Sequence, residues 1–167
     1  MQRDEFGRTA LHYAAAHADL DAVRRLLGAE DVNARDNHDW TPLHFAAQAA
    51  VPELVALLLD AGADIDAVTD KGMPAIYWAI MSSGADPIAT VRLLRARGAD
   101  PTKATMKSYF GPKSPLDTVK EIGNDPRHAG RIGGGAVGLG GGLDPARLLL
   151  EIGLGRLIQA VIAPHRE

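Results

Sequence analysis

Residues 7–15 read GRTALHYAA, and residues 39–47 repeat this pattern as DWTPLHFAA, 32 positions later. Residues 72–80, GMPAIYWAI, give a third version after a further 33 positions. A second shared block precedes a turn in each copy, and it reads VRRLL at 23–27, VALLL at 55–59 and VRLLR at 91–95. A period of 32–33 residues that recurs in this way indicates an array of stacked units, each too small to bury its own apolar face.

Each copy predicts two helices followed by a turn. Thr9 and Thr41 can cap a first helix, and Pro42 is favourable in a first turn. The first helices are rich in alanine, which lets neighbouring backbones approach closely. The second helices carry the apolar face, which we assign to Leu20, Val23, Leu26, Leu27, Leu54, Val55, Leu58, Leu59, Val91, Leu93 and Leu94.

The turns contain residues that accept a left-handed backbone. Gly62 and Gly98 follow the second helices and can end them in this conformation. Asp39 stands where the other two copies have Gly7 and Gly72. Because Asp tolerates positive φ better than most residues, we expect this turn to be retained.

These residues resemble the ankyrin repeat, whose unit of about 33 residues has a Thr-Pro-Leu-His signature. The signature positions here are Thr9, Leu11, His12, Thr41, Pro42, Leu43 and His44, with the turn residues Gly62 and Gly98. The resemblance implies an all-α repeat solenoid with β-turn hairpins, and it implies that the signature histidines are structural. We expect an ankyrin domain over 1–126, with copies at about 4–36, 37–69, 70–103 and, in degenerate form, 108–126.

Composition limits the classes of function. The 167 residues carry a net charge of −3 and no cysteine, which argues against a basic nucleic-acid binder and against thiolate chemistry. The first twenty residues do not resemble a signal peptide, and no apolar run has the length of a membrane helix. We also find no Gly-x-Ser-x-Gly, phosphate-loop or His-x-x-x-His motif. We therefore expect a cytoplasmic, non-catalytic protein that has no metal or cofactor and no membrane or nucleic-acid partner.

The resemblance implies that a protein partner binds the concave face formed by hairpin tips and first helices. The family's variable contact positions correspond here to Phe6, Arg8, His17, Asn37, His38, Trp40, Gln48, Asp70, Lys71, Met73 and Met81. Tyr13, Phe45 and Trp78 also occupy first-helix positions, but these side chains could equally pack between copies. Trp40 has two readings of equal weight: it anchors a partner, or it packs on the next hairpin.

The hairpin between the third and fourth copies is longer than the others. It runs from Pro101 to Lys113 and contains three lysines and two aromatic residues. We consider Lys107, Tyr109 and Phe110 a candidate contact site. The alternative is that Tyr109 and Phe110 simply cover the array.

The C-terminal part departs from the repeat pattern. We expect a glycine-rich linker at 127–143, a helix within 144–163 and a short tail at 164–167. The segment could fold back as a cap, bind a partner or move freely, or be a non-native extension. The chain similarly resembles short stand-alone ankyrin proteins of bacterial type, some of which inhibit or accompany a neighbouring enzyme. We expect a monomer, and the alternative is a self-assembling structural protein in which the apolar tail of one chain covers another.

Overall fold

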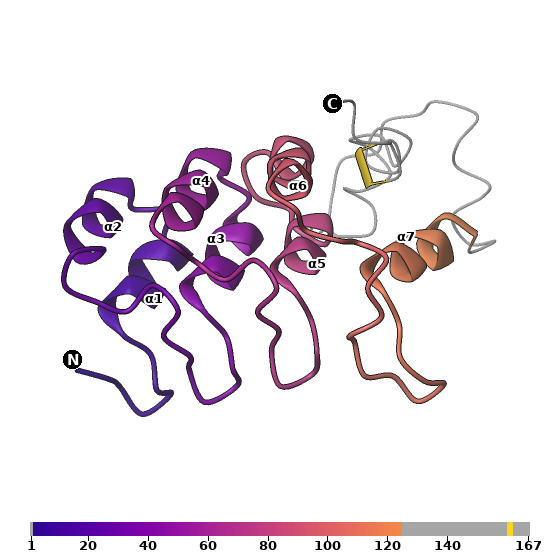
Figure 1. Cartoon of the computed structure of the whole chain (residues 1–167), viewed down its shortest axis with the longest axis horizontal. Helices are drawn as coiled ribbons and strands as arrows, with labels where there is room; N and C mark the ends of the chain where they lie inside the picture. Colours follow the sequence, from indigo (N-terminus) through magenta and orange to yellow (C-terminus); the bar gives the residue numbers. More distant parts are fainter. Residues whose placement is uncertain (1, 125–159, 162–167) are drawn as a thin grey trace, which may run out of the picture.

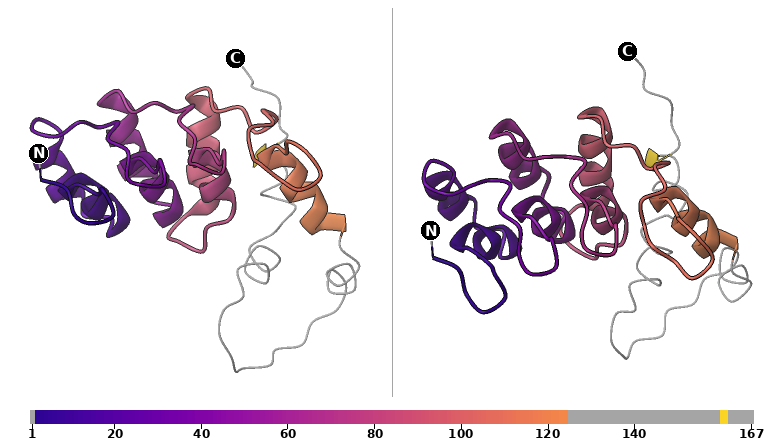
Figure 2. Two further views of the ribbon diagram at one scale, coloured as in Figure 1. Left: turned by 90° about the horizontal axis from the view of Figure 1, so that it is seen from below. Right: turned by 60° about the horizontal axis from the view of Figure 1, so that its bottom comes forward.

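The structure, a computed structural model, describes residues 2–124 and 160–161. The described helices form two rows (Figure 1). The inner row contains α1 (Ala10–Ala16), α3 (Pro42–Ala49), α5 (Ala75–Ile80) and α7 (Pro115–Asn124). The outer row contains α2 (Leu20–Leu26), α4 (Pro52–Asp60) and α6 (Pro87–Ala96). Hairpin loops project from the inner row in one direction, and two further views show the same regular stacking (Figure 2). The fold is the expected all-α repeat solenoid.

Helix ends follow from local sequence. Thr9 and Thr41 precede α1 and α3 in an extended conformation, as expected for N-caps. Asp19 and Asp86 cap α2 and α6, each accepting a hydrogen bond from the backbone three residues later at 2.9 Å. Proline supplies the first residue of α3, α4 and α6, where its missing N–H has no cost.

The core lies between the rows and between successive copies. Leu11, Leu43 and Ile76 are buried on the inner helices, and alanines at the α1–α3 and α3–α5 contacts are almost completely buried. The outer helices bury Val23, Leu54, Val55, Leu58, Val91 and Leu94, as the pattern predicts. The remaining residues of that pattern, Leu20, Leu26, Leu27, Leu59 and Leu93, are half-buried. Leu20, Leu26 and Leu27 belong to the first described copy, against which no earlier described copy packs.

The turns adopt the expected backbone. Asp39 has φ of 59°, close to the 75° of Gly7 and the 77° of Gly72, so the aspartate keeps the glycine conformation. Gly62 and Gly98 have φ of 91° and 100° after their helices. In each hairpin the residue before the tip is bonded back across the turn, for example from the Asp36 nitrogen to the Trp40 oxygen at 2.9 Å.

The fourth copy is represented by a hairpin and α7. Ser114 donates from its nitrogen at 3.0 Å and its hydroxyl at 2.7 Å to one oxygen of Asp117 at the start of this helix. The linker expected at 127–143 and the tail at 164–167 lie outside the described residues. Of the helix expected within 144–163, only Ala160 and Val161 are described; both are helical and buried. None of the described helices is long and apolar enough to cross a membrane.

Candidate partner-binding surface

The inner helices of the first three copies differ in charge from the outer ones. Among the described residues, α1, α3 and α5 contain no Asp, Glu, Lys or Arg. The outer helices α2, α4 and α6 all contain charged residues. The first three inner helices therefore offer aromatic, aliphatic and neutral polar groups, and their charged neighbours lie on the hairpins. The fourth inner helix, α7, differs because it carries Asp117, Lys120 and Glu121.

An aromatic row crosses the first three copies where the hairpins join the inner helices. We define it as Phe6, Tyr13, Phe45, Trp40 and Trp78. The centroid of the Trp40 ring lies 4.8 Å from that of Phe45 and 4.3 Å from that of Trp78. The guanidinium carbon of Arg8 lies 5.1 Å from the Phe45 centroid, 5.4 Å from that of Phe6 and 6.0 Å from that of Tyr13. Cation–π attraction thus joins Phe6 and Tyr13 of the first copy to Phe45 of the second.

Trp40 is half-buried, and its ring packs on the next copy. The ring stacks on Trp78 of α5, the inner helix of the next copy. Because this stacking joins two copies, substitution of Trp40 is expected to affect stability as well as any contact with a partner. Phe45 and Trp78 are half-buried too, whereas Phe6 is 49% and Tyr13 is 41% exposed.

Two aspartates that sequence reasoning missed organise the hairpins. Asp36 has no exposed side-chain surface; one of its carboxylate oxygens accepts from the nitrogens of His38 and Trp40, and the other lies 3.2 Å from Arg8 Nε. Asp4 holds the first hairpin similarly, and the Tyr13 hydroxyl donates to it at 2.5 Å. This bond lowers the pKa of Asp4 and raises that of Tyr13. The signal available in the sequence was an aspartate at the same position of two hairpins, 32 residues apart.

Backbone hydrogen bonds connect successive hairpins. The nitrogen of Asn37 donates to the Phe6 oxygen at 2.9 Å, and that of Asp70 donates to the His38 oxygen at 3.0 Å. Lys107 continues this arrangement, donating from its nitrogen to the Lys71 oxygen at 2.9 Å. The hairpin tips therefore form one ordered edge. This edge brings together the predicted positions Asn37, His38, Asp70, Lys71 and Lys107.

The other predicted contact residues lie along the inner row. His17 and Gln48 are exposed at or near the ends of α1 and α3. Met73 and Met81 are half-buried, before and after α5. Within the described residues, no cluster of His, Cys, Asp or Glu has the makeup of a metal site.

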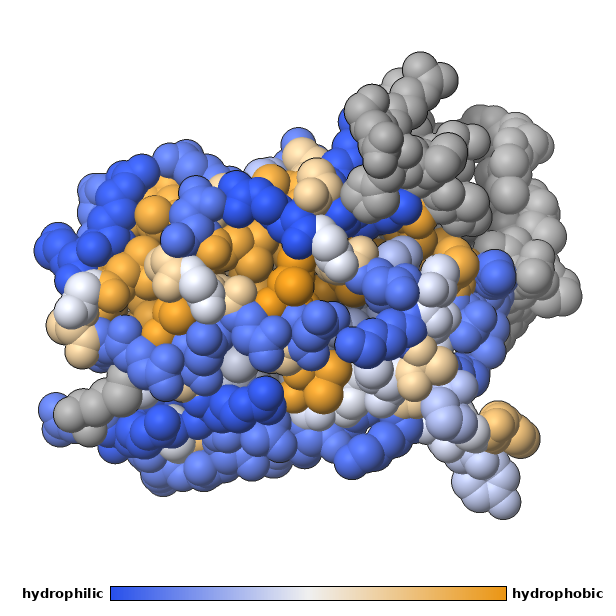
Figure 3. Space-filling view, in the orientation of Figure 1, coloured by the Kyte–Doolittle hydropathy of each residue, from blue (hydrophilic) through white to orange (hydrophobic). Residues whose placement is uncertain are grey.

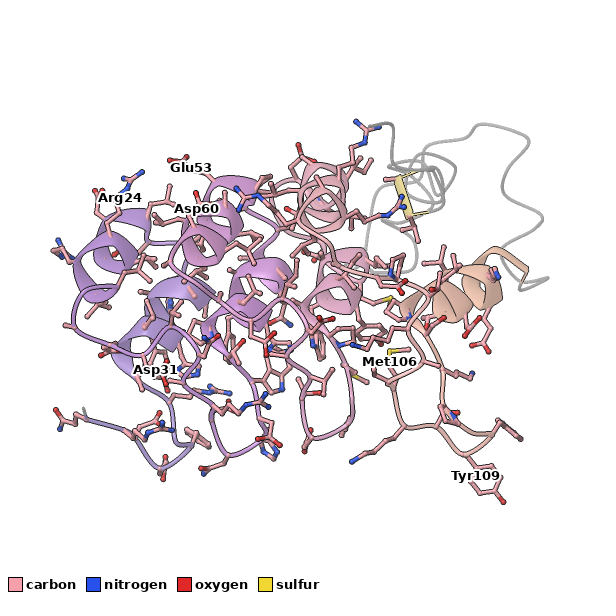
Figure 4. The ribbon with its side chains drawn as sticks, viewed as in Figure 1. Arg24, Asp31, Glu53, Asp60, Met106 and Tyr109 are labelled. Atoms are coloured by element: carbon pink, nitrogen blue, oxygen red, sulfur yellow. The ribbon has the colours of Figure 1, made fainter. Side chains whose placement is uncertain are left out.

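The longest hairpin ends in two bare aromatic rings. We call residues 107–112 the finger; Tyr109 and Phe110 at its tip are 96% and 89% exposed. Met106 and Lys113 pair at its base, and the Ser108 hydroxyl donates to the Gly111 oxygen at 2.7 Å. Figures 3 and 4 show the finger projecting away from the body. The two rings therefore do not cover the array, contrary to one of the readings from sequence.

The signature histidines connect one copy to the next. His44 Nδ1 accepts from the Thr41 nitrogen at 3.0 Å, so this ring atom carries no proton. Nε2 therefore holds the proton and donates to the Met73 oxygen of the following hairpin at 3.2 Å. His12 repeats this geometry with Thr9 and the Trp40 oxygen. Tyr77 occupies the third position, so the equivalent imidazole link is missing there.

Burial makes stability depend on pH through these rings. It lowers the pKa of His44 from 6.5 to about 4, and it also lowers that of His12. Because the unfolded chain binds protons more readily, His44 contributes fully above about pH 6.5 and loses its contribution as the pH falls toward 4. The expected loss is about 3 kcal/mol, at about 1.4 kcal/mol per pKa unit. Urea unfolding between pH 7 and 4.5 measures this; an equal slope in His44→Gln would contradict the assignment.

Comparison with known proteins places these features in a wider context. A profile of ankyrin repeats in three copies matches residues 11–105. The human BCL-6 corepressor-like protein 1 is 34% identical over 122 residues, which are 71% of this chain and 7% of that protein. The human neurogenic locus notch homolog protein 2 is 40% identical over 96 residues, which are 56% of this chain and 4% of that protein. The chain thus spans less than a tenth of the length of these relatives.

Proposed function

The chain belongs to the ankyrin repeat family of protein-interaction modules, and from this premise we propose that it binds a protein partner on the concave face formed by the hairpin tips and inner helices. The observation that carries the proposal is the uncharged surface of the inner helices α1, α3 and α5, which is bordered by charged hairpins. Protein interfaces have this composition: charged residues are depleted at the centre, aromatic residues and arginine are enriched, and the rim is polar. The proposed role is non-catalytic, as is general for this family.

The aromatic row supplies the anchors. Phe6 and Tyr13 keep about half of their surface for a partner, and Arg8 is held between the rings and the buried carboxylate of Asp36. A side chain fixed in this way loses little conformational entropy on binding. Tyr, Trp and Arg are also the residue types that dominate binding energies in interfaces. We therefore place the centre of the contact on copies one and two.

The finger supplies a second contact. The whole hairpin that carries the finger, residues 101–113, contains three lysines and no acidic residue, although the whole chain has a net charge of −3. Lys107 is tied to the Asp70 oxygen through its Nζ at 2.8 Å, so the finger is joined to the preceding hairpin. Two rings exposed on a positioned hairpin favour insertion into an apolar pocket of the partner. Lys103 and Lys113 already form ion pairs with Asp66 and Glu121. The exposed Lys107 is therefore the lysine that favours a carboxylate at the rim of this pocket.

The Gln48→Arg variant tests the inner face. Placing a charge on the uncharged surface of α3 is expected to weaken partner binding at least about tenfold, because the guanidinium would lose water without gaining a partner. Gln48 is exposed, so the melting temperature should change little. The partner is first isolated with the intact chain, and the dissociation constant is then measured by calorimetry. Ala61→Arg, at the exposed end of α4, adds the same charge on the outer row and should bind normally.

The double variant Tyr109→Ala/Phe110→Ala tests the finger. Hot-spot aromatic residues contribute about 2 kcal/mol or more, which corresponds to at least about a thirtyfold loss of affinity. Stability should be unaffected, since both rings are almost fully exposed. Wild-type affinity in this variant would remove the finger from the interface while leaving the inner face untouched as a proposal.

The narrower form of the proposal is that the partner is an enzyme encoded beside this protein, which the chain inhibits or assists in the cytoplasm. Adding purified chain to that enzyme and following its rate tests this form. The alternative function is self-assembly through the C-terminal tail. Light scattering separates the two, because self-assembly requires a mass above that of one chain.

A further inference from the structure

The end of the outer row, beyond α6, is occupied by residues that lie far from α6 in the sequence. In Figure 1 the outer helices follow one another as α2, α4 and α6, and the described segment Ala160–Val161 continues this row beside α6. The inner row continues at the same level with α7. Ala160 and Val161 thus lie where a fourth copy would place its second helix.

The segment is buried in the apolar core of the array, and one hydrogen bond joins it to α6. Ala160 is 5% and Val161 is 2% exposed, and both belong to the same core cluster as Val91 and Leu94 of α6. Arg95, also on α6, donates from Nη1 to the Ala160 oxygen at 2.8 Å. Burial of this degree matches that of the valines and leucines inside the array. The segment is therefore packed as part of the core.

The sequence around the two residues is compatible with this position. Residues 156–163 read RLIQAVIA, with aliphatic residues three to four positions apart as in the second-helix blocks of the other copies. Sequence comparison among the repeats does not reveal this relation, because residues 125–159 separate it from α7. The other copies join their two helices by only a few residues.

We propose that the Ala160–Val161 segment serves in cis as the second helix of the fourth repeat and closes the apolar end of the array. An exposed terminal repeat is costly in a solenoid, because its apolar face has no neighbour. The 35 intervening residues are ample to reach α6, since an extended chain covers about 3.3 Å per residue. Tethering also gives the segment an effective concentration in the millimolar range, which favours its own α6 over that of another chain.

Charge introduced at Val161 tests the closure in the full-length chain. Val161→Asp is expected to lower the melting temperature by about 5 °C or more, because it places a carboxylate in the core. Amide exchange in α6 should become at least about tenfold faster, whereas exchange in α1 and α2 should not change. Arg92→Asp is the matched control, since Arg92 is an exposed residue of α6 and should tolerate a carboxylate. Unchanged exchange in α6 of Val161→Asp would overturn the proposal.

Chemical crosslinking tests whether the contact is made within one chain. The protein has no cysteine, so the double variant Arg95→Cys/Ala160→Cys carries only the two introduced thiols. A short bis-maleimide should join them into an internally looped chain that migrates ahead of the uncrosslinked chain on a denaturing gel. The pair Arg24→Cys/Ala160→Cys, with one thiol on α2, should give little of this product. A product with the mass of two chains would show exchange between chains and would overturn closure in cis, as would equal yields from both pairs.

Discussion

Replacing His44 by alanine should lower the free energy of unfolding by about 4 kcal/mol, the sum of a cavity and two sets of lost hydrogen bonds. The ring is fully buried. Without it, the Thr41 nitrogen and hydroxyl lose their acceptor, and the Met73 oxygen loses its donor. A buried polar group without a partner costs about 1–3 kcal/mol. Because the ring joins the second copy to the third, its loss affects both.

Two further variants show whether the loss of stability is specific to His44 or follows from replacing any histidine. His17→Ala, at an exposed position, should change the unfolding free energy by less than about 0.5 kcal/mol. His44→Asn should fall between wild type and alanine, since its oxygen can accept from Thr41 but its side chain is too short for Met73. Asp117 already accepts from Ser114 in this manner. Urea unfolding of the three variants at pH 7 checks this order, and equal stability of His44→Ala and wild type would contradict it.

Gly72→Ala should also destabilise the array by about 4 kcal/mol, for reasons of backbone geometry. Gly72 has φ of 77°, which disfavours any residue with a Cβ atom. A Cβ at this position would lie 1.9 Å from the Thr105 oxygen, which belongs to the backbone of the following hairpin. The hairpins must move apart to admit it, and the Lys107–Lys71 backbone bond lies directly beside this contact.

Gly62→Ala is the matched control for this prediction. Gly62 has φ of 91°, so it carries a similar conformational cost, but a Cβ there meets no atom within 4 Å. We expect a loss of only about 1–2 kcal/mol. The difference between the two variants, measured by chemical unfolding, isolates the contact with Thr105. Equal losses would show that backbone conformation alone accounts for both.

The repeat could be predicted from sequence because its signals are local and periodic. The signature around Thr41 and His44 marks the start of an inner helix, and Asp39 keeps the glycine conformation because its φ is locally tolerated. The alignment of the hairpin tips in one row could be predicted from the same repeat period.

Features that depend on contacts between distant residues were harder to predict. The burial of Asp36 depends on Arg8, and the stacking of Trp40 on Trp78 depends on the offset between two copies. Neither the burial of Asp36 nor this stacking can be obtained from the spacing of residues in the sequence alone. The position of Ala160 beside α6 is still less accessible, because the intervening sequence has no repeat period.

The imidazole links have a mechanical consequence. They join copy one to copy two and copy two to copy three, but at the next junction Tyr77 replaces the histidine, and α7 packs less extensively on α5 than α5 does on α3. If the two ends of the array were pulled apart, this junction should yield first. The first three copies would then unfold together, at a higher force.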